Sequence, residues 1–267
     1  MSRRWLQICD DGSVNIGNGG ALNLAGFVRA TAGRVGTSSD LRGGVGVAGP
    51  VAVVHGYVDA AIPTDLAVPA ATFFDDATAF FQSQGRTFIV WVPSSATSHL
   101  KEATSRGLAV TGDGCPAMVA SKPVGVVGGL RFQLATDDEA HEIFGDLCER
   151  GYQQPGMAWL MARQQGYRAP DSFWHIAFDG DVPVSAACGF QTGDTGGVYS
   201  VATPPEFRAR GFAAAVTGHA TNHLFELGAA RVVLQASKLG YGVYERLGFT
   251  TYDHYDRFTA SPAAPPP

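Results

Sequence analysis

One stretch, residues 196–249, limits the fold of this chain more than any other. It holds an apolar strand-like run at 198–202, a turn with two prolines, the basic segment 208–213 (RARGFA), an amphipathic helix and a second apolar run at 231–235. The first N–H groups of a helix have no partner inside the helix, and the helix dipole favours an anion there. Gly211 has no Cβ, so a phosphate can approach the backbone closely. The layout therefore predicts a phosphate-binding cradle in an α/β fold.

The same stretch resembles the Gcn5-related N-acetyltransferase (GNAT) family in two motifs. The family signature Arg/Gln-x-x-Gly-x-Gly/Ala is matched by Arg208, Gly211 and Ala213, and the later segment 244–249 (YERLGF) is similar to the segment that joins the family's helix to its last strand. The two motifs stand in the family's order and spacing, and the resemblance covers roughly the C-terminal half. It implies a GNAT fold, a mixed twisted α/β sheet flanked by helices.

The resemblance also implies a site for acetyl-CoA as co-substrate. Backbone N–H groups of the segment 208–214 would hold the pyrophosphate, and those of 201–203 would bind the pantetheine arm and stabilise an oxyanion on the thioester carbonyl. Ser237 stands where the family often has an asparagine that contacts CoA, and it has a shorter reach. The cofactor-binding residues that we expect are Val201, Ala202, Thr203, Arg208, Ala209, Arg210, Gly211, Phe212, Ala213, Ala214, Ser237 and Tyr241.

Tyr244 is the residue that the resemblance assigns to catalysis. A phenol with a pKa of about 10 is protonated at neutral pH and can give a proton to the departing thiolate. Tyr241, one turn earlier, is the alternative acid, and a merely packed helix tyrosine is the structural alternative. The strand 198–202 carries no carboxylate to act as general base. His175, Asp171, Glu142 and an ordered water stay open for that role.

The N-terminal half alternates apolar runs and helical patterns, but it lacks the Arg-x-x-Gly signature. We expect helices at 22–35, 71–84 and 98–106, and strands at 50–57 and 87–92. The Gly- and Ser-rich segment 33–49 matches no nucleotide-binding loop and is expected to be a flexible connector. This half is either a degenerate GNAT-like domain or an unrelated α/β extension.

These patterns predict three regions: an N-terminal α/β domain at 1–123, a GNAT acetyltransferase domain at 124–260 and a disordered proline-rich tail at 261–267. In the second region we expect a first strand at 130–135, a helix capped by Thr136, a second helix at 156–165, and a hairpin that turns at 179–181.

Composition narrows the partners and the compartment. The chain has a net charge of −5 and no Lys/Arg run, which argues against nucleic acid as a partner. No apolar segment reaches the length of a membrane span, and the four cysteines are scattered, so we expect no membrane association and a reducing cytoplasmic location. His219 and His223 have the i, i+4 spacing of zinc ligands, but the glutamate of that motif is absent, so we expect no metal.

The sequence thus predicts an acetyl-CoA-dependent N-acetyltransferase that acts on a primary amine, either a small molecule or a peptide. An acyl-CoA-binding module without catalysis is the alternative, motivated by the missing carboxylate. A transferase that uses aminoacyl-tRNA is a third, which the acidic charge disfavours. A homodimer is left open.

Overall fold

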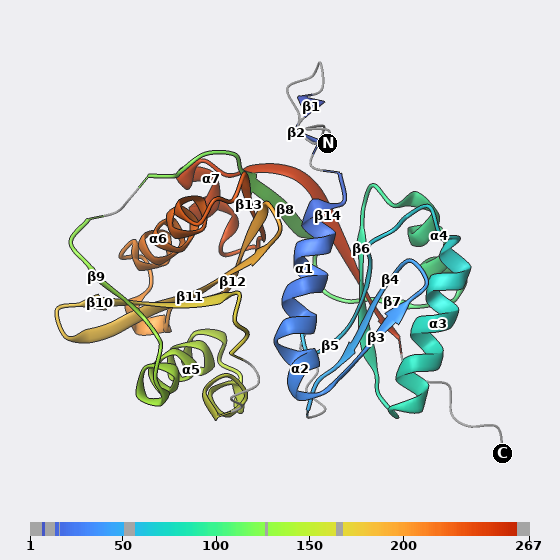
Figure 1. The fold of residues 1–267 in the computed structure, drawn as a ribbon, viewed down its shortest axis with the longest axis horizontal. Helices are drawn as coiled ribbons and strands as arrows, with labels where there is room; N and C mark the ends of the chain where they lie inside the picture. The colour runs from blue at the N-terminus through green and yellow to red at the C-terminus, as the bar shows by residue number, and fades with distance from the viewer. Residues whose placement is uncertain are drawn as a thin grey trace. The chain divides into compact units, whose positions relative to one another are not determined.

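The computed structural model describes residues 7–8, 14–15, 17–50, 57–125, 128–163 and 168–260. The chain forms two compact units: unit 1 comprises residues 1–117 and 252–267, and unit 2 comprises residues 118–251. Each unit is built on a mixed β-sheet with helices packed against it (Figure 1). Strands β8 (Cys115–Ala120) and β14 (Thr250–Ala260) each contain a point where the chain changes unit. The short strands β1 (Gln7–Ile8) and β2 (Val14–Asn15) pair separately.

Unit 1 has the strand order β3-β4-β5-β6-β14, with β7 also paired to β14. Its sheet is antiparallel except between β5 and β6, which are parallel and are joined by helix α3. Helix α1 lies on one side of these strands, and α3 with α4 lies on the other (Figure 1). The elements are α1 (Gly19–Ala30), α2 (Ala32–Val35), β3 (Thr37–Leu41), β4 (Gly44–Ala48), β5 (Asp59–Pro63), α3 (Ala70–Ser83), β6 (Phe88–Pro93), α4 (Thr97–Ser105) and β7 (Ala109–Val110).

The predicted helix at 71–84 and the predicted strand at 87–92 are confirmed as α3 and β6. The apolar stripe of α3 lies in the core of unit 1, where Phe73, Phe74 and Phe81 are fully buried. Every residue of β6 is buried, as its uninterrupted apolar sequence predicts for a strand covered on both faces. One layer of the core of unit 1 therefore lies between α3 and the sheet, and α1 buries Leu24, Phe27 and Val28 as well.

The prediction of a flexible connector at 33–49 is wrong, because β3 and β4 form a hairpin there. The glycines of β4 serve close packing: an added Cβ at Gly44 would lie 2.5 Å from the ring of Phe73, and one at Gly46 would lie 2.8 Å from the ring of Phe80. The predicted helix at 22–35 is divided into α1 and α2 at Thr31. Most of the predicted strand at 50–57 lies outside the described residues.

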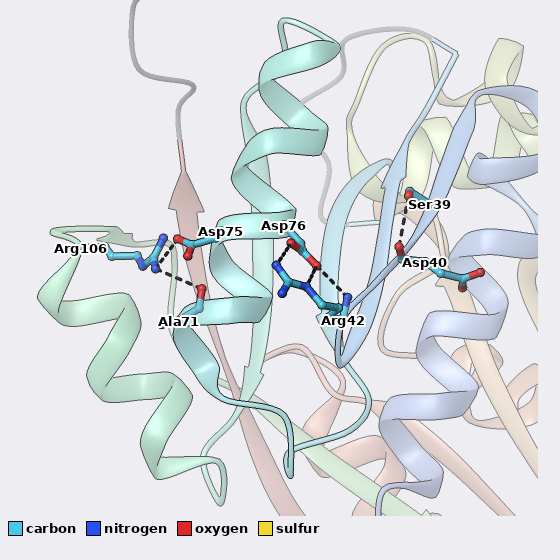
Figure 2. A network of polar contacts seen from close by, with 7 residues as sticks. All are labelled: Ser39, Asp40, Arg42, Ala71, Asp75, Asp76 and Arg106. Atoms are coloured by element: carbon cyan, nitrogen blue, oxygen red, sulfur yellow. Dashed lines mark hydrogen bonds and ion pairs between the residues drawn. The ribbon is translucent and has the colours of Figure 1, made fainter.

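Two arginines tie α3 to neighbouring segments of unit 1 (Figure 2). Arg42, in the β3–β4 turn, donates from Nε and from a terminal nitrogen to the two carboxylate oxygens of Asp76 at 2.9 and 2.7 Å. Arg106, just after α4, reaches Asp75 at 2.8 Å and the carbonyl of Ala71. The paired geometry lowers the pKa of Asp76 to about 2, first through the hydrogen bonds from Arg42.

Unit 2 has the strand order β8-β13-β12-β11-β10-β9. Helix α6 packs on one face of β10–β12 and α5 lies on the other (Figure 1). Strands β12 and β13 are parallel and are joined by α6, as β5 and β6 are by α3 in unit 1. The elements are β9 (Arg131–Leu134), α5 (Asp138–Tyr152), the π-helical turn η1 (Trp159–Arg163), β10 (Ser172–Asp179), β11 (Val182–Thr192), β12 (Thr195–Ala202), the 3₁₀ turn η3 (Pro205–Phe207), α6 (Phe212–Glu226), β13 (Arg231–Gln235) and α7 (Tyr241–Leu247).

The predicted hairpin at 179–181 and the first strand at 130–135 are confirmed as β10–β11 and β9. The helix cap is a correction: the carboxylate of Asp137, one residue after Thr136, accepts from the N–H of Ala140 at 2.8 Å. The second helix, expected at 156–165, is assigned as the short turn η1, and residues 164–167 lie outside the description.

The division of the chain at 123/124 stays a prediction, and the tail at 261–267 falls outside the described residues. Among the helices that the structure describes, none combines the length and the apolar character that a membrane span requires.

Candidate acyl-CoA site

The parallel strands β12 and β13 pair only at their beginnings. The register joins Thr195, Gly196 and Gly197 of β12 to residues 231–233, whereas β12 continues to Ala202. Because the ladder to β13 stops at Gly197, the backbone edge of residues 198–202 on that side is available to another extended chain. The residues expected to bind pantetheine lie at the end of this edge.

A β-bulge lies where β12 leaves β13. Opposite β11, Tyr199 pairs with Cys188 and Ala202 pairs with Ala186, so four residues of β12 face three of β11. The extra residue fits Ser200, which has φ +51, a left-handed conformation that is uncommon outside glycine. The bulge redirects the backbone of β12 at the point where the two strands separate.

Three side chains from two other elements, α5 and β11, hold the carbonyl groups of this bulge. Cys148 Sγ on α5 donates to the carbonyl of Ser200 at 3.8 Å, Tyr152 Oη to that of Val201 at 3.0 Å, and Ser185 Oγ on β11 to that of Ala202 at 2.9 Å. No local sequence pattern points to these residues, because only the fold brings each of them to the bulge. With the carbonyls occupied, the strand is held in one conformation.

Helix α6 begins directly after the basic segment, with Gly211 as its N-cap. Gly211 has φ +83, and an added Cβ there would have no atom within 4 Å, so the space in front of the helix is open. As a glycine, the cap residue has no side chain that could accept from the first N–H groups of the helix. The first helical hydrogen bond runs from the N–H of Ala215 to the carbonyl of Gly211. The N–H groups of Phe212, Ala213 and Ala214 therefore form the donor set that a phosphate group requires.

The two arginines of the segment are engaged with the protein itself. Arg208 donates to the carbonyls of Thr203 and Gly151 at 3.1 and 2.6 Å. Arg210 forms an ion pair with Asp179 at 2.8 Å. Both side chains are exposed, and their positive charge remains close to the open helix end. The two arginine side chains thus shape the loop, and the first N–H groups of α6 are the donors available to an anion.

Tyr244 lies on α7, buried at 8% exposure within the core of unit 2. Burial raises the pKa of its phenol to about 12. Tyr241, one turn earlier, is half-buried. Ser237 lies between β13 and α7, where its hydroxyl accepts from the N–H of Gly240 at 3.1 Å, just before α7 begins. The predicted cofactor-binding residues and Tyr244 thus lie in β12 and in the segments that follow it in unit 2.

His175, a candidate general base, lies on β10 under α6 at 1% exposure. Its Nε2 is 3.4 Å from Nδ1 of His223, and both line a cavity of about 180 Å³ with His219 and Glu226. Burial, followed by the neighbouring imidazoles, lowers the pKa of His175 to about 3, so it is a poor proton acceptor at neutral pH. Asp171 and Glu142 are both exposed, and general-base catalysis by either of them stays a prediction.

In the part of the chain that the structure describes, no group of three or more His, Cys, Asp or Glu side chains is arranged to hold a metal ion.

Comparison with known proteins identifies unit 2. Residues 135–249 match the family model described as Acetyltransferase (GNAT) family. A search of curated proteins found no match. The family transfers acyl groups from acyl-CoA, which fits the open strand edge and the open helix end described above.

Solved structures extend the likeness to the whole chain at the level of the fold. A GCN5-related N-acetyltransferase from Kribbella flavida is 17% identical with a TM-score of 0.68, over 91% of this chain and 95% of that one. Another GCN5-related N-acetyltransferase, from Sphaerobacter thermophilus, is 17% identical with a TM-score of 0.56, over 81% and 80%. A tandem GNAT protein from the clavulanic acid biosynthesis pathway is 14% identical with a TM-score of 0.54, over 73% and 70%.

These matches cover both units, so the N-terminal half is GNAT-like in its fold although it lacks the signature. Residues 135–249 are a domain of the GNAT acetyltransferase family, carried by a chain with the fold of tandem GNAT proteins.

Proposed function

We propose that this protein transfers an acetyl group from acetyl-CoA to a primary amine, at a site in unit 2. The observation that carries the proposal is the separation of β12 from β13 directly before an uncapped glycine-led helix. An extended pantetheine arm fits the free edge at 201–203, and its diphosphate fits the N–H groups of 212–214. The two features are adjacent in the chain, so one ligand engages both.

The bulge at Ser200 supports a role in the reaction itself. A backbone that is fixed before the substrate binds can direct an N–H group at the thioester oxygen as it becomes negative, without reorganising. Hydrogen bonds from Cys148, Tyr152 and Ser185 hold the neighbouring carbonyls and so fix this backbone. The amine attacks the carbonyl carbon, the C–S bond breaks, and the thiolate of CoA leaves.

Tyr244 is the proposed proton donor to that thiolate. Its raised pKa of about 12 keeps the phenol protonated at any physiological pH. A free thiol has a pKa of about 8.5, so the transfer would be unfavourable for a thiolate in water. A thiolate in the same buried setting is also poorly solvated. This raises the pKa of the thiol and brings it closer to the pKa of the phenol. The amine loses its proton to water, and the phenolate of Tyr244 regains a proton from water before the next turnover.

Tyr244→Phe tests this assignment, and Tyr241→Phe on the same helix tests the alternative acid. We expect Tyr244→Phe to lower kcat by about 100-fold or more, with the KM for acetyl-CoA changed little, because general acid catalysis contributes on the order of 10²–10⁴. The measurement is release of free CoA thiol with a panel of primary amines. Full turnover by Tyr244→Phe would remove the acid role.

A non-catalytic acyl-CoA-binding module is the second candidate. It is favoured by the pKa of His175, and by the lack of any carboxylate in β12. Calorimetry separates the two functions: tight binding of acetyl-CoA, with no CoA release by any amine of the panel, would support the module and reject the transferase.

A further inference from the structure

Unit 1 contains a cavity of about 240 Å³ at the ends of its own pair of parallel strands. Strands β5 and β6 pair at Ala60–Ile89 and Ala61–Val90, and both then end in proline, at Pro63 and Pro93. The parallel ladder stops at Ala61 and Val90, before these prolines, and a proline has no N–H with which to resume it. Pro63 and Pro93 both line the cavity. In open α/β sheets, ligands bind in the crevice beyond the carboxyl ends of such strands.

The walls of this cavity are largely apolar and aromatic. Ala21 and Leu66 contribute with the two prolines, and Tyr252 and Tyr255 present aromatic rings from β14. Apolar walls with a few polar groups are the usual composition of a small-molecule site. The volume is below the range of about 300–1,000 Å³ that is typical of drug-sized ligands, so the occupant is small.

One full charge, the carboxylate of Asp253, faces this cavity. It is held in one orientation by donors on both oxygens: Ser95 Oγ at 2.6 Å, the N–H of Ser95 at 3.3 Å and the N–H of His254 at 2.8 Å. None of the ion pairs found among the described residues uses Asp253, and none of the described residues lining the cavity is basic. A negative charge without a protein counter-ion is therefore directed at a small apolar space.

Helix α1 begins beside the same cavity, which bears on the sign of the occupant's charge. Its N-terminus carries a partial positive charge of roughly half a unit, which acts only within the first turn. The side chain of its N-cap, Asn18, donates one of its two amide N–H groups to the carbonyl of Thr64 at 2.7 Å. The full charge of Asp253 outweighs the partial charge of the helix, so the cavity favours a cation.

We propose that unit 1 binds a small organic amine in this cavity, with its ammonium group on Asp253 and its apolar body between the tyrosine rings and the prolines. Aromatic faces add to the binding of an ammonium group by a cation–π contribution. Unit 1 lacks the Arg-x-x-Gly cradle, so this is a site for an amine and not for CoA. The proposal goes beyond transfer in unit 2, since the bound amine need not be acetylated.

The test is calorimetry on the full chain without acetyl-CoA. The probes are methylamine, benzylamine and phenethylamine, with benzyl alcohol as the neutral counterpart and benzoate as the anionic one. We expect the larger amines to bind, benzyl alcohol to bind at least about tenfold more weakly, which corresponds to the loss of one charged hydrogen bond, and benzoate not to bind. Binding of benzoate as tight as that of benzylamine, or no binding by any amine, would overturn the proposal.

Asp253→Asn is the decisive variant, because the amide keeps the shape and can still accept from Ser95. Asp256→Asn is its matched control: Asp256 lies on the same strand and accepts from Ser94 Oγ at 3.1 Å, but it does not line the cavity. We expect only Asp253→Asn to lose amine binding, with acetyl-CoA binding retained by both. Equal amine affinity for the two variants would reject the site, and it would leave the proposal for unit 2 untouched.

Discussion

The burial of His175 predicts a specific dependence of stability on pH. In the folded protein the pKa of His175 is about 3, whereas an unfolded histidine has a pKa of about 6.5. As the pH falls below 6.5, the unfolded chain takes up a proton at this residue and the folded chain does not. The contribution of neutral His175 to the free energy of unfolding is therefore fully present above pH 6.5. It declines as the pH falls from 6.5 to 3 and changes no further below pH 3.

The size of the effect follows from the same two pKa values. Between pH 7.5 and 5.5 the unfolded residue passes from about one-tenth to about nine-tenths protonated, while the folded residue stays neutral. The proton-linkage relation gives a loss of about 1.4 kcal/mol in the free energy of unfolding. His141 and His219 also have lowered pKa values, so the loss in the wild type is larger than the share of His175.

The assay is urea denaturation followed by far-UV circular dichroism at both pH values, for the wild type and for His175→Gln. The other histidines titrate in both proteins, so the difference between their pH dependences isolates His175. We expect the variant to lose about 1.4 kcal/mol less than the wild type, with an unchanged denaturant slope. His175→Phe serves as a second variant if glutamine prevents folding. Equal pH dependence in wild type and variant would refute the reasoning.

Two further outcomes are expected from unit 2. Gly211→Ala and Gly180→Ala replace glycines at φ +83 and +61, each with no atom within 4 Å of the new Cβ, so both should lower stability by about 1–2 kcal/mol, and only Gly211→Ala should weaken CoA binding in calorimetry. Equal CoA affinity for the two would contradict the cradle. Cys148 and Cys188 are fully buried with raised thiol pKa values, so a thiol reagent should modify them only after denaturant is added; rapid reaction in the native protein would contradict their burial.

Local patterns in the sequence were sufficient for several elements of the fold. The phenylalanine stripe predicted α3, and the Asp-Gly-Asp turn predicted the β10–β11 hairpin, because periodicity and turn chemistry act within a few residues. The Arg-x-x-Gly segment pointed to the start of α6 for the same reason. The prediction of a connector at 33–49 was wrong, because the glycines of β4 are required by phenylalanine rings that only the folded core brings close to them.

The fixed backbone of the candidate site could not have been predicted in this way. The bulge at Ser200 is held by Cys148, which lies 52 residues earlier, and by Ser185 on a neighbouring strand. No local pattern relates a cysteine on one helix to a carbonyl on a strand. No local pattern distinguishes Asp253 from the other charged residues around it either. Only the pairing of β14 with β6 places it beside Ser95.

The route of β14 bears on how the protein is made by the ribosome. Residues 255–260 pair with β6, and Phe258 and Ala260 belong to the core of unit 1. The sheet of unit 1 is therefore complete only once residues 255–260 have been synthesised, by which time all of unit 2 has been made. Until then the edge of β6 is open to other strands, so nascent or truncated chains that stop before residue 255 should depend on chaperones and aggregate more readily than the finished protein.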